Sequence, residues 1–359
     1  MTLLKITNQP MRYAWGSKDL MPDYLGYQFD GQPMAEVWFG THSTSPAQID
    51  DVVGGSLRDR VGELGFMVKF LAAQSPLSIQ AHPSKARAEA MFGQHHQSYS
   101  DANHKPEMII ALTEFRALCG FRERAELEAD LQALAQSSIH LAGLWGDYQS
   151  MGLEGAVNWI YKSSDTSVTQ LVANATVLGR KRSRLIEELF DLYPGDKGIL
   201  MSVLMNLVTL EPGQAMFLPA GNIHAYLFGL GVEVMASSDN VLRGGLTPKP
   251  VDVKELQRVL DYTELPDPVL KPKQLAQGLT HFQVPLDDFQ VYRLSPTASS
   301  LLIDLELKGS AIAVCTEGEI TISTSKDEVL TLSRGEACYF ADARLFSVAG
   351  NGVGYLAMG

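Results

Sequence analysis

The stretch that most constrains the fold covers residues 218–249 and reads LPAGNIHAYLFGLGVEVMASSDNVLRGGLTPK. Two segments in it, residues 223–227 and 231–235, alternate apolar and polar side chains with the period of two that is typical of half-buried strands. Glycine, proline and serine divide these segments, as they do in turns. His224 and Glu233 each lie on the less apolar face of their strand. Two adjacent strands that carry a histidine and a carboxylate on one face could line a metal site inside a small β-barrel.

The composition places the chain among globular cytoplasmic proteins. Its 359 residues predict two or three domains. A net charge of −12 argues against a nucleic-acid partner, which would need clustered lysine and arginine. The three cysteines form no CxxC pair, so we expect them to be reduced and buried, as in a cytoplasmic protein. Because no apolar run is long enough to cross a bilayer and the first residues lack a signal-peptide core, we expect no membrane association.

The chain changes character twice. Short apolar runs broken by glycine, proline, asparagine and aspartate predict strands up to about residue 120. Leu127, Leu131 and Leu134 then form the stripe of an amphipathic helix, and two later segments repeat this pattern. Strands are expected again from residue 199, with helices at residues 84–91 and 253–259. We therefore predict a metal-binding β-domain, a helical insertion and a C-terminal β-domain, with boundaries at residues 1–120 plus 197–262, 121–196 and 263–359.

The two β-domains share a short phrase. Residues 209–215 and 331–337 both read T-L-x-x-G-[EQ]-A, and each phrase leads into an apolar strand. Strands of about five residues joined by short turns are typical of a sandwich or jelly roll. Two weakly similar β-barrels in one chain are the simplest interpretation, and we expect the C-terminal one to be structural or regulatory.

Four residues form a candidate metal site. Gln80 and His82 lie on one face of a strand, and Glu107 and His224 come from other strands. Imidazole and carboxylate ligands suit zinc, and an open position on the metal can polarise a substrate oxygen. An amide ligand is uncommon for zinc, however, and a single histidine on a strand is more often a hydrogen-bonded core or surface residue.

The motifs LSIQAHP, NHKPEM, FLPAGNIHAYL and EVMASSDNVLRGGLTPK, together with DKGIL, resemble the type I phosphomannose isomerases in order along nearly the whole chain. Ala81 departs from the family pattern, where a valine is expected between the two ligands. The resemblance implies a mainly β fold with a cupin-like jelly-roll metal domain, a helical domain and a C-terminal cupin-like β-barrel. It also implies one zinc ion per chain, a small sugar phosphate as substrate, and a monomer.

The same resemblance assigns roles to individual residues. The zinc ligands would be Gln80, His82, Glu107 and His224. Arg243 would be catalytic, with Lys105, Asp239 and His104 near the reacting carbons. The phosphate would be held by Ser78 and Lys249, and the pocket would be lined by Trp15, Glu36, Tyr226 and Glu233. By their residue type alone, Arg243 and Lys249 would be ordinary surface charges, although the glycines and proline around them are typical of backbone that approaches a ligand closely.

The implied reaction interconverts mannose 6-phosphate and fructose 6-phosphate through a cis-enediol. Either Lys105 or Asp239 would carry the proton, and the sequence leaves that choice open. Two alternatives compete with this interpretation. One is a cupin that binds sugar or controls transcription without catalysis. The other is a non-haem iron oxygenase, whose two histidines and one carboxylate would leave Gln80 without a role.

Overall fold

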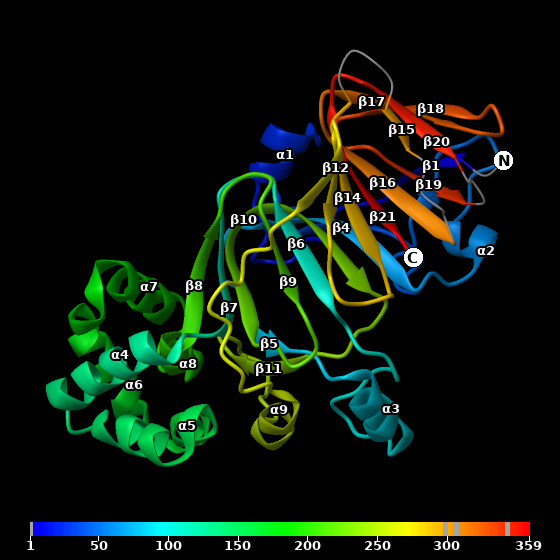
Figure 1. The fold of residues 1–359 in the computed structure, drawn as a ribbon. Coiled ribbons are helices and arrows are strands. Elements are labelled where there is room, and N and C mark those ends of the chain that lie inside the picture. Colours follow the sequence, from blue (N-terminus) through cyan, green and yellow to red (C-terminus); the bar gives the residue numbers. More distant parts are fainter. Residues whose placement is uncertain (1–2, 297–300, 304–308, 342–344) are drawn as a thin grey trace.

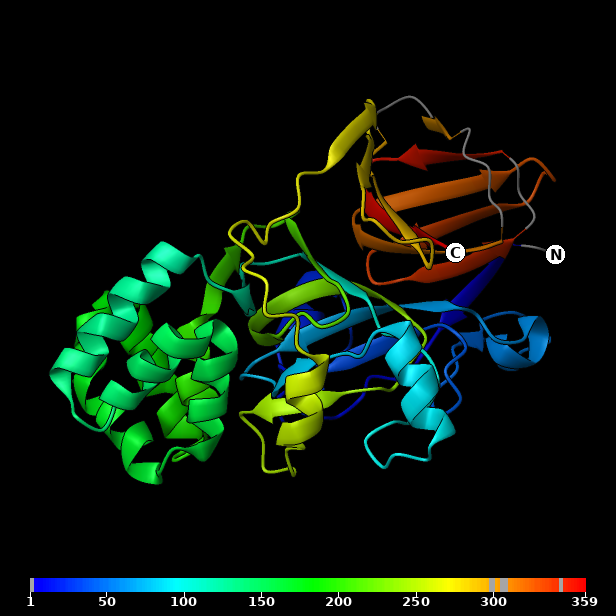
Figure 2. The same cartoon turned by 60° about the horizontal axis from the view of Figure 1, so that its bottom comes forward.

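The computed structural model describes residues 3–296, 301–303, 309–341 and 345–359. Three groups of elements follow one another across the molecule (Figure 1): a helical unit, a central sheet and a C-terminal pair of sheets. Figure 2, turned by 60°, shows the same order, with the helices separated from the C-terminal strands by the central sheet. The mainly β character with a helical insertion is therefore as predicted.

A nine-stranded sheet forms the centre of the molecule. Its strands are β2 (Glu36–Phe39), β4 (Phe66–Ala73), β5 (Ile79–Ala81), β6 (Glu107–Ala111), β7 (Phe115–Phe121), β8 (Met205–Leu210), β9 (Ala215–Leu218), β10 (His224–Ala236) and β11 (Leu242–Gly245). β10 is the common member, because it pairs with β5 and β7 at its start and with β4 and β6 further along. The two strands predicted at residues 223–227 and 231–235 are in fact this one strand, which passes through an irregularity between Tyr226 and Phe228.

The expected closed barrels are wrong. Within the described ranges the sheets are open and end at unpaired edges: β11 and β2 end the main path of the central sheet, and β12 and β3 end the larger C-terminal sheet. The length of β10 explains the open form of the central sheet. With thirteen residues, β10 pairs first with β5 and β7 and then with β4 and β6. The sheet therefore branches at β10 and does not close on itself.

The C-terminal unit consists of two sheets packed on a shared apolar core. The larger contains, in spatial order, β12 (Lys273–Ala276), β13 (Leu279–Phe282), β14 (Gln290–Leu294), β21 (Val353–Met358), β16 (Ser310–Glu317), β19 (Ala337–Ala341), β1 (Leu3–Thr7) and β3 (Gln48–Ile49). The smaller contains β15 (Leu301–Ile303), β20 (Phe346–Gly350), β17 (Glu319–Thr324) and β18 (Val329–Ser333). A strand was predicted at residues 300–307, and its parts other than β15 lie outside the described residues.

Two short strands from the start of the chain belong to this C-terminal unit. β1 pairs with β19, where Ile6 lies opposite Ala337, and it also pairs with β3. An ion pair of 2.6 Å between Lys5 and Glu336 reinforces the contact. The proposed domain boundaries stay a prediction, and β1 and β3 are the elements that cross them.

The repeated phrase forms the same local structure twice. In both copies the segment before the glycine lies in a strand, β8 or β18, and the residues after it enter β9 or β19. Gly213 and Gly335 both have φ of 87°, a left-handed conformation that glycine adopts at little cost. The two β-units therefore share a turn as well as a sequence pattern.

The helical unit contains α4 (Arg124–Ser137), α5 (Ala142–Lys162), α6 (Asp165–Asn174), the short 3-10 helix η1 (Ala175–Leu178), α7 (Gly179–Leu192) and α8 (Gly198–Leu204). The predicted leucine stripe of α4 is buried. The strand expected from residue 199 is wrong, because residues 199–204 are helical and β8 begins only at Met205. Every residue of α8 is buried, so its apolar run has no polar face that would reveal the period of a helix.

The remaining helices are α1 (Leu20–Leu25), α2 (Leu57–Val61), α3 (Lys85–Gly93) and α9 (Val253–Val259). The two predicted ones, α3 and α9, are confirmed, and Ser84 caps α3 by accepting a hydrogen bond from the backbone N–H of Arg87. Cys119, Cys315 and Cys338 are free and buried, as expected. Among the helices of the described residues, none combines the length and apolar character needed to span a membrane.

Candidate metal centre and active-site cavity

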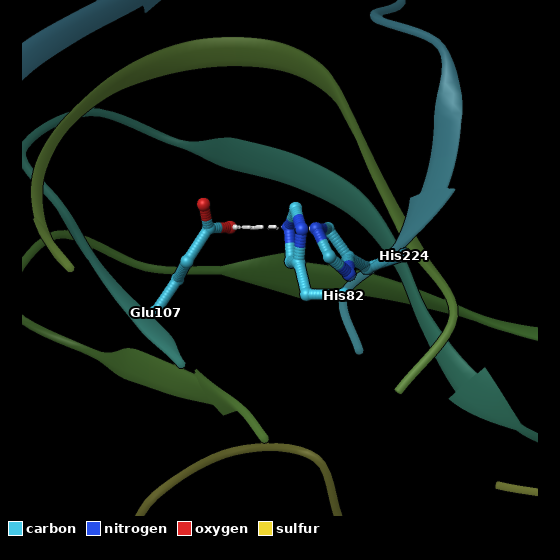
Figure 3. Close-up of side chains that lie close together, drawn as sticks. All are labelled: His82, Glu107 and His224. Atoms are coloured by element: carbon cyan, nitrogen blue, oxygen red, sulfur yellow. Dashed lines mark ion pairs between the residues drawn. The ribbon is translucent and has the colours of Figure 1, made fainter. Parts of the chain in front are cut away.

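Three side chains converge where three strands of the central sheet begin or end. His82 directly follows β5, Glu107 begins β6 and His224 begins β10. Figure 3 shows the Glu107 carboxylate directed toward the two imidazole rings. Its Oε2 atom lies 3.5 Å from Nε2 of His82 and 3.4 Å from Nε2 of His224. One ligand atom from each residue lies within 4.8 Å of the other two, a spacing that fits a single metal ion.

The other nitrogen of each histidine determines which atom faces the centre. Nδ1 of His82 lies 2.6 Å from the carbonyl oxygen of Asn240, and Nδ1 of His224 lies 3.1 Å from that of Asn222. A carbonyl oxygen only accepts hydrogen bonds, so each Nδ1 carries the proton. Each Nε2 therefore presents a lone pair to the centre, as in metal-binding histidines oriented by a backbone carbonyl.

The three inward-facing atoms have no hydrogen-bond partner among the described residues. Nε2 of His82, Oε2 of Glu107 and Nε2 of His224 are all buried and unsatisfied. Buried polar atoms are nearly always paired in folded proteins, so three orphans at one point require an explanation. All three are electron-pair donors of the type that zinc prefers, and the residues present therefore fit a zinc ion.

The protonation states agree with this interpretation. Burial lowers the pKa of His82 to about 4, against the opposing effect of the Glu107 carboxylate, so the ring is neutral at neutral pH. Burial alone would raise the pKa of Glu107, but Lys105 Nζ lies 2.9 Å from its Oε1. The lysine and the nearby histidines hold the pKa of Glu107 well below its usual value. The site therefore contains a neutral imidazole and an ionised carboxylate without needing a metal to deprotonate them.

Gln80 lies beside this group through strand register. It is directly opposite His224 in the β5–β10 pair and directly opposite Arg243 in the β11–β5 pair. Residues opposite one another in adjacent antiparallel strands project from the same face of the sheet. Gln80 therefore lies between His224 and Arg243 in one row on this face of the sheet.

A cavity of about 370 Å³ opens beside the metal centre. Most of the predicted site residues line it: Trp15, Glu36, Gln80, Lys105, Glu107, Tyr226, Glu233, Asp239, Arg243 and Lys249. Asp239 and Lys249 are exposed at the surface, while Arg243 is half-buried. One small space thus brings together two of the candidate metal ligands, Gln80 and Glu107, and a mixture of fixed charges.

Four predicted residues are absent from the described residues that line this cavity. His82 and His224 lie at the metal centre beside it, whereas His104 and Ser78 lie elsewhere. His104 is turned toward the C-terminal unit, where its Nε2 lies 2.6 Å from Oδ1 of Asp288. Ser78 lies in the segment before β5 and is absent from the residues that line the cavity in the described part of the chain. Among the described residues, neither side chain is recorded in contact with His82, Glu107 or His224.

A buried ion-pair network also lines the cavity. Lys69 of β4 lies 2.9 Å from Oε2 of Glu233 and 3.4 Å from Oε1 of Glu36. Tyr226 donates a hydrogen bond of 2.9 Å to the other Glu233 oxygen, and the indole N–H of Trp38 donates one of 3.0 Å to Glu36. Burial by itself lowers the pKa of Lys69, but the two carboxylates raise it above its usual value, so the ammonium group stays charged. The wall is therefore polar although it is buried.

Apart from aliphatic residues and methionines, the sequence interpretation missed four lining residues, Tyr13, Trp38, His42 and Lys69. Lys69 left a signal, since it is the one charged residue in the otherwise apolar strand at residues 66–73. A lysine at such a position is seldom fully buried unless it is paired. The other three lie in ordinary surroundings that gave no comparable signal.

Comparison with known proteins gives consistent matches. Residues 3–124 match the family model described as phosphomannose isomerase type I, catalytic domain. The mannose-6-phosphate isomerase of Shigella flexneri is 34% identical, and the match covers 94% of this chain and 94% of that protein. The enzyme of the same name from Rattus norvegicus is 35% identical over 90% of each chain.

Solved structures extend the likeness to the entire fold. A mutant phosphomannose isomerase from Salmonella typhimurium superposes with a TM-score of 0.91 and 31% identity, covering 100% of this chain and 99% of that one. A mannose 6-phosphate isomerase structure bound with zinc and yttrium matches with a TM-score of 0.90, 31% identity and the same coverage. With relatives of this identity along almost its full length, the chain belongs to the type I phosphomannose isomerase family.

Proposed function

We propose that the protein is a zinc-dependent mannose-6-phosphate isomerase that interconverts mannose 6-phosphate and fructose 6-phosphate. The observation that carries the proposal is the convergence of three unsatisfied ligand atoms, from His82, Glu107 and His224, beside a cavity lined by fixed charges. Relatives that share a third of the sequence carry the name of this activity, and one similar structure is bound with zinc.

His82, Glu107, His224 and Gln80 would hold one zinc ion per chain. A bound zinc ion supplies a Lewis acid that polarises a sugar oxygen. Gln80 is supported by its place opposite His224 in the strand register. The neutral state of His82 and the ionised state of Glu107 support the same ligand set.

Arg243 would stabilise the negative charge that develops on the sugar oxygens as the cis-enediol forms. A guanidinium group stays protonated under physiological conditions, so it donates hydrogen bonds and does not accept the proton. Its position opposite Gln80 in the β11–β5 pair supports this role. Fixed cations aimed at developing charge are among the largest contributions to enzymatic rates.

The proton that moves between C2 and C1 would be carried by Lys105 or Asp239. Lys105 contacts the ligand Glu107, and Asp239 lines the same cavity. Lys249 at the mouth would bind the phosphate group, a charge-assisted contact that orients the sugar. The roles assigned to Ser78 and His104 rest on the family resemblance alone, because neither side chain lines the cavity.

The layout that accompanies this function is a cupin-like metal domain, the helical insertion and a cupin-like C-terminal domain. Support comes from the turn shared by residues 209–215 and 331–337 and from the two β-units that contain it. We further propose a cytoplasmic monomer. Its net charge of −12 and its free, buried cysteines are consistent with that setting.

A coupled assay tests the proposal directly. Purified protein is supplied with mannose 6-phosphate, and formation of fructose 6-phosphate is followed through a phosphoglucose isomerase and a dehydrogenase. We expect turnover that disappears on removal of the metal with a chelator and returns when zinc is added. Binding of the sugar phosphate without turnover, in protein shown to contain zinc, would instead favour a non-catalytic sugar-binding role.

A further inference from the structure

His42 and Asp239 form a pair at the edge of the cavity. Nε2 of His42 lies 3.1 Å from one carboxylate oxygen of Asp239 and 3.0 Å from the other. The His42 side chain is only 13% exposed, whereas that of Asp239 is 58% exposed. Both residues line the cavity. The histidine therefore lies behind the carboxylate, and the carboxylate is the more accessible of the two to a ligand.

The contacts of Nδ1 show which ring nitrogen of His42 carries the proton. The backbone N–H of Thr44 points at Nδ1 of His42 from 3.3 Å, and the Thr44 hydroxyl lies 2.9 Å from the same atom. A backbone N–H can only donate, so Nδ1 is the acceptor and the ring proton lies on Nε2. His42 thus donates its one N–H to Asp239. With Nδ1 occupied by Thr44, the ring has no free nitrogen to exchange a proton with a substrate.

The pair is held from several sides. The His42 ring packs edge-on against Trp38, with ring centroids 4.8 Å apart and planes at 77°. Trp38 in turn donates to Glu36 and lies under the ammonium group of Lys69. The backbone N–H of Asp239 donates a hydrogen bond of 2.8 Å to Asp101. These contacts restrict the orientations available to the imidazole ring and to the backbone of Asp239.

We propose that His42 is a positioning residue, which holds Asp239 ionised and oriented so that its carboxylate accepts a hydrogen bond from a hydroxyl group of the bound sugar. This inference rests on the proposed function and deepens it. The hydrogen bond from His42 lowers the pKa of Asp239, against the raising effect of partial burial. Lys105 and Lys69 also lower it, and Tyr13 and Arg243 line the same cavity.

Two substitutions distinguish the loss of the hydrogen bond to Asp239 from the loss of the volume of the His42 side chain. In His42→Gln the side-chain amide can place an N–H near the position of Nε2, whereas in His42→Asn the amide falls near Nδ1 and does not reach Asp239. We expect His42→Asn to lower kcat/KM by about 10- to 100-fold, the usual effect of losing a hydrogen bond to a charged group. Because Asp239 then loses the donor that lowers its pKa, the acid limb of the pH profile moves to higher pH. His42→Gln should restore most of both properties.

A double-mutant cycle shows whether His42 affects kcat/KM through Asp239. If His42 acts through Asp239, adding His42→Asn to Asp239→Asn changes kcat/KM little beyond Asp239→Asn alone. Equal losses in the two backgrounds would overturn the proposal, as would a His42→Asn enzyme with the wild-type pH profile. His140→Ala, on the exposed surface of the helical unit, serves as the control for replacing a histidine.

A measurement without substrate tests the positioning role of His42 separately from the proposed isomerase function. The titration of the Asp239 carboxyl carbon, assigned by its loss in Asp239→Asn, is followed by carbon-13 NMR in wild-type protein and in His42→Asn. A higher titration midpoint in His42→Asn supports the positioning role, and an unchanged midpoint overturns it. Absence of isomerase turnover in the wild-type protein would refute the proposed function, whereas this titration still decides the role of His42.

Discussion

The ammonium group of Lys69 lies 2.9 Å from a carboxylate oxygen of Glu233, and both side chains are almost completely buried. A charge removed from water is expensive unless an opposite charge lies close to it. Here Glu36 and Glu233 share one lysine, and hydrogen bonds from Trp38 and Tyr226 satisfy their remaining oxygens. The charges of Lys69, Glu36 and Glu233 therefore stabilise one another. Removing one of them leaves a buried charge without its partner.

Lys69→Met is expected to destabilise the protein by about 3–5 kcal/mol, because two buried carboxylates lose their cation. The measurement is the free energy of unfolding in urea. Lys271→Met provides the matched control: Lys271 pairs with Asp267 at 3.0 Å on the surface, and its loss should cost about 0–1 kcal/mol. Equal costs for the two variants would show that the buried network does not stabilise the fold.

Glu107→Gln is expected to weaken zinc binding by more than about 100-fold, beyond the usual effect of removing an outer hydrogen-bond partner of a ligand. The substitution replaces the anionic oxygen that lies between His82 and His224 with a neutral amide. Metal content by plasma mass spectrometry gives the result, with circular dichroism to confirm folding. Glu114→Gln, an exposed glutamate in the turn between β6 and β7, should retain about one zinc per chain. Full zinc content in Glu107→Gln would contradict the assigned ligand set.

Arg243→Ala is expected to reduce kcat by about 100- to 1,000-fold while zinc content stays unchanged. The reason is that Arg243 lies opposite Gln80 but is not a proposed zinc ligand, so its loss should remove only the stabilisation of the developing oxyanion. Steady-state kinetics and metal analysis of the same sample provide the test. Wild-type turnover in this variant would remove Arg243 from the mechanism.

Lys249→Ala is expected to raise KM for the phosphorylated sugar by about 10-fold with a smaller change in kcat, since a phosphate contact distant from the reacting carbons contributes mainly to binding. Competition by inorganic phosphate offers a second readout and should weaken in the variant. Lys254→Ala, a surface lysine on α9, is the control. A fall in kcat with an unchanged KM would show that Lys249 contributes to the chemical step and not to substrate binding.

Gly245→Ala is expected to lower the melting temperature more than Gly213→Ala does. Both glycines have positive φ, so alanine is strained at either position, at a cost of about 1–3 kcal/mol. A Cβ at Gly245 would in addition lie 2.6 Å from Cα of Gly198, whereas one at Gly213 meets no atom within 4 Å. Differential scanning calorimetry measures the difference. Equal shifts would mean that α8 and β11 can separate at no cost.

His82, Glu107 and His224, which the structure brings together, could be predicted as candidate metal ligands because they lie in distinct motifs along the chain. The same motifs led to His104, whose neighbour Lys105 does line the cavity. His104 instead pairs with Asp288, a residue of the C-terminal unit far along the chain, and no local pattern reveals such a contact. Local signals thus identified the motif, whereas tertiary packing decided which side chains in it face the site.

The errors in predicting secondary structure also have physical causes. The apolar run at residues 199–204 is buried on all sides, so it has neither the stripe of a surface helix nor the alternation of a half-buried strand. The sequence predicted two strands, residues 223–227 and 231–235, separated by a segment that contains Gly229. In the structure this segment lies inside β10, and Gly229 approaches the backbone of Glu114 so closely that a Cβ there would be 2.6 Å from its carbonyl oxygen.

The pairing of β1 with β19 has a consequence for the order of folding. Lys5 and Glu336 are in contact although they are 331 residues apart in the sequence. At a synthesis rate of about 5–20 residues per second, β1 leaves the ribosome roughly 15 to 70 s before its partner exists. The central sheet and the helical unit are complete in sequence well before that moment. β1 is therefore synthesised before the central sheet and the helical unit, while β19, its neighbour in the C-terminal sheet, follows both.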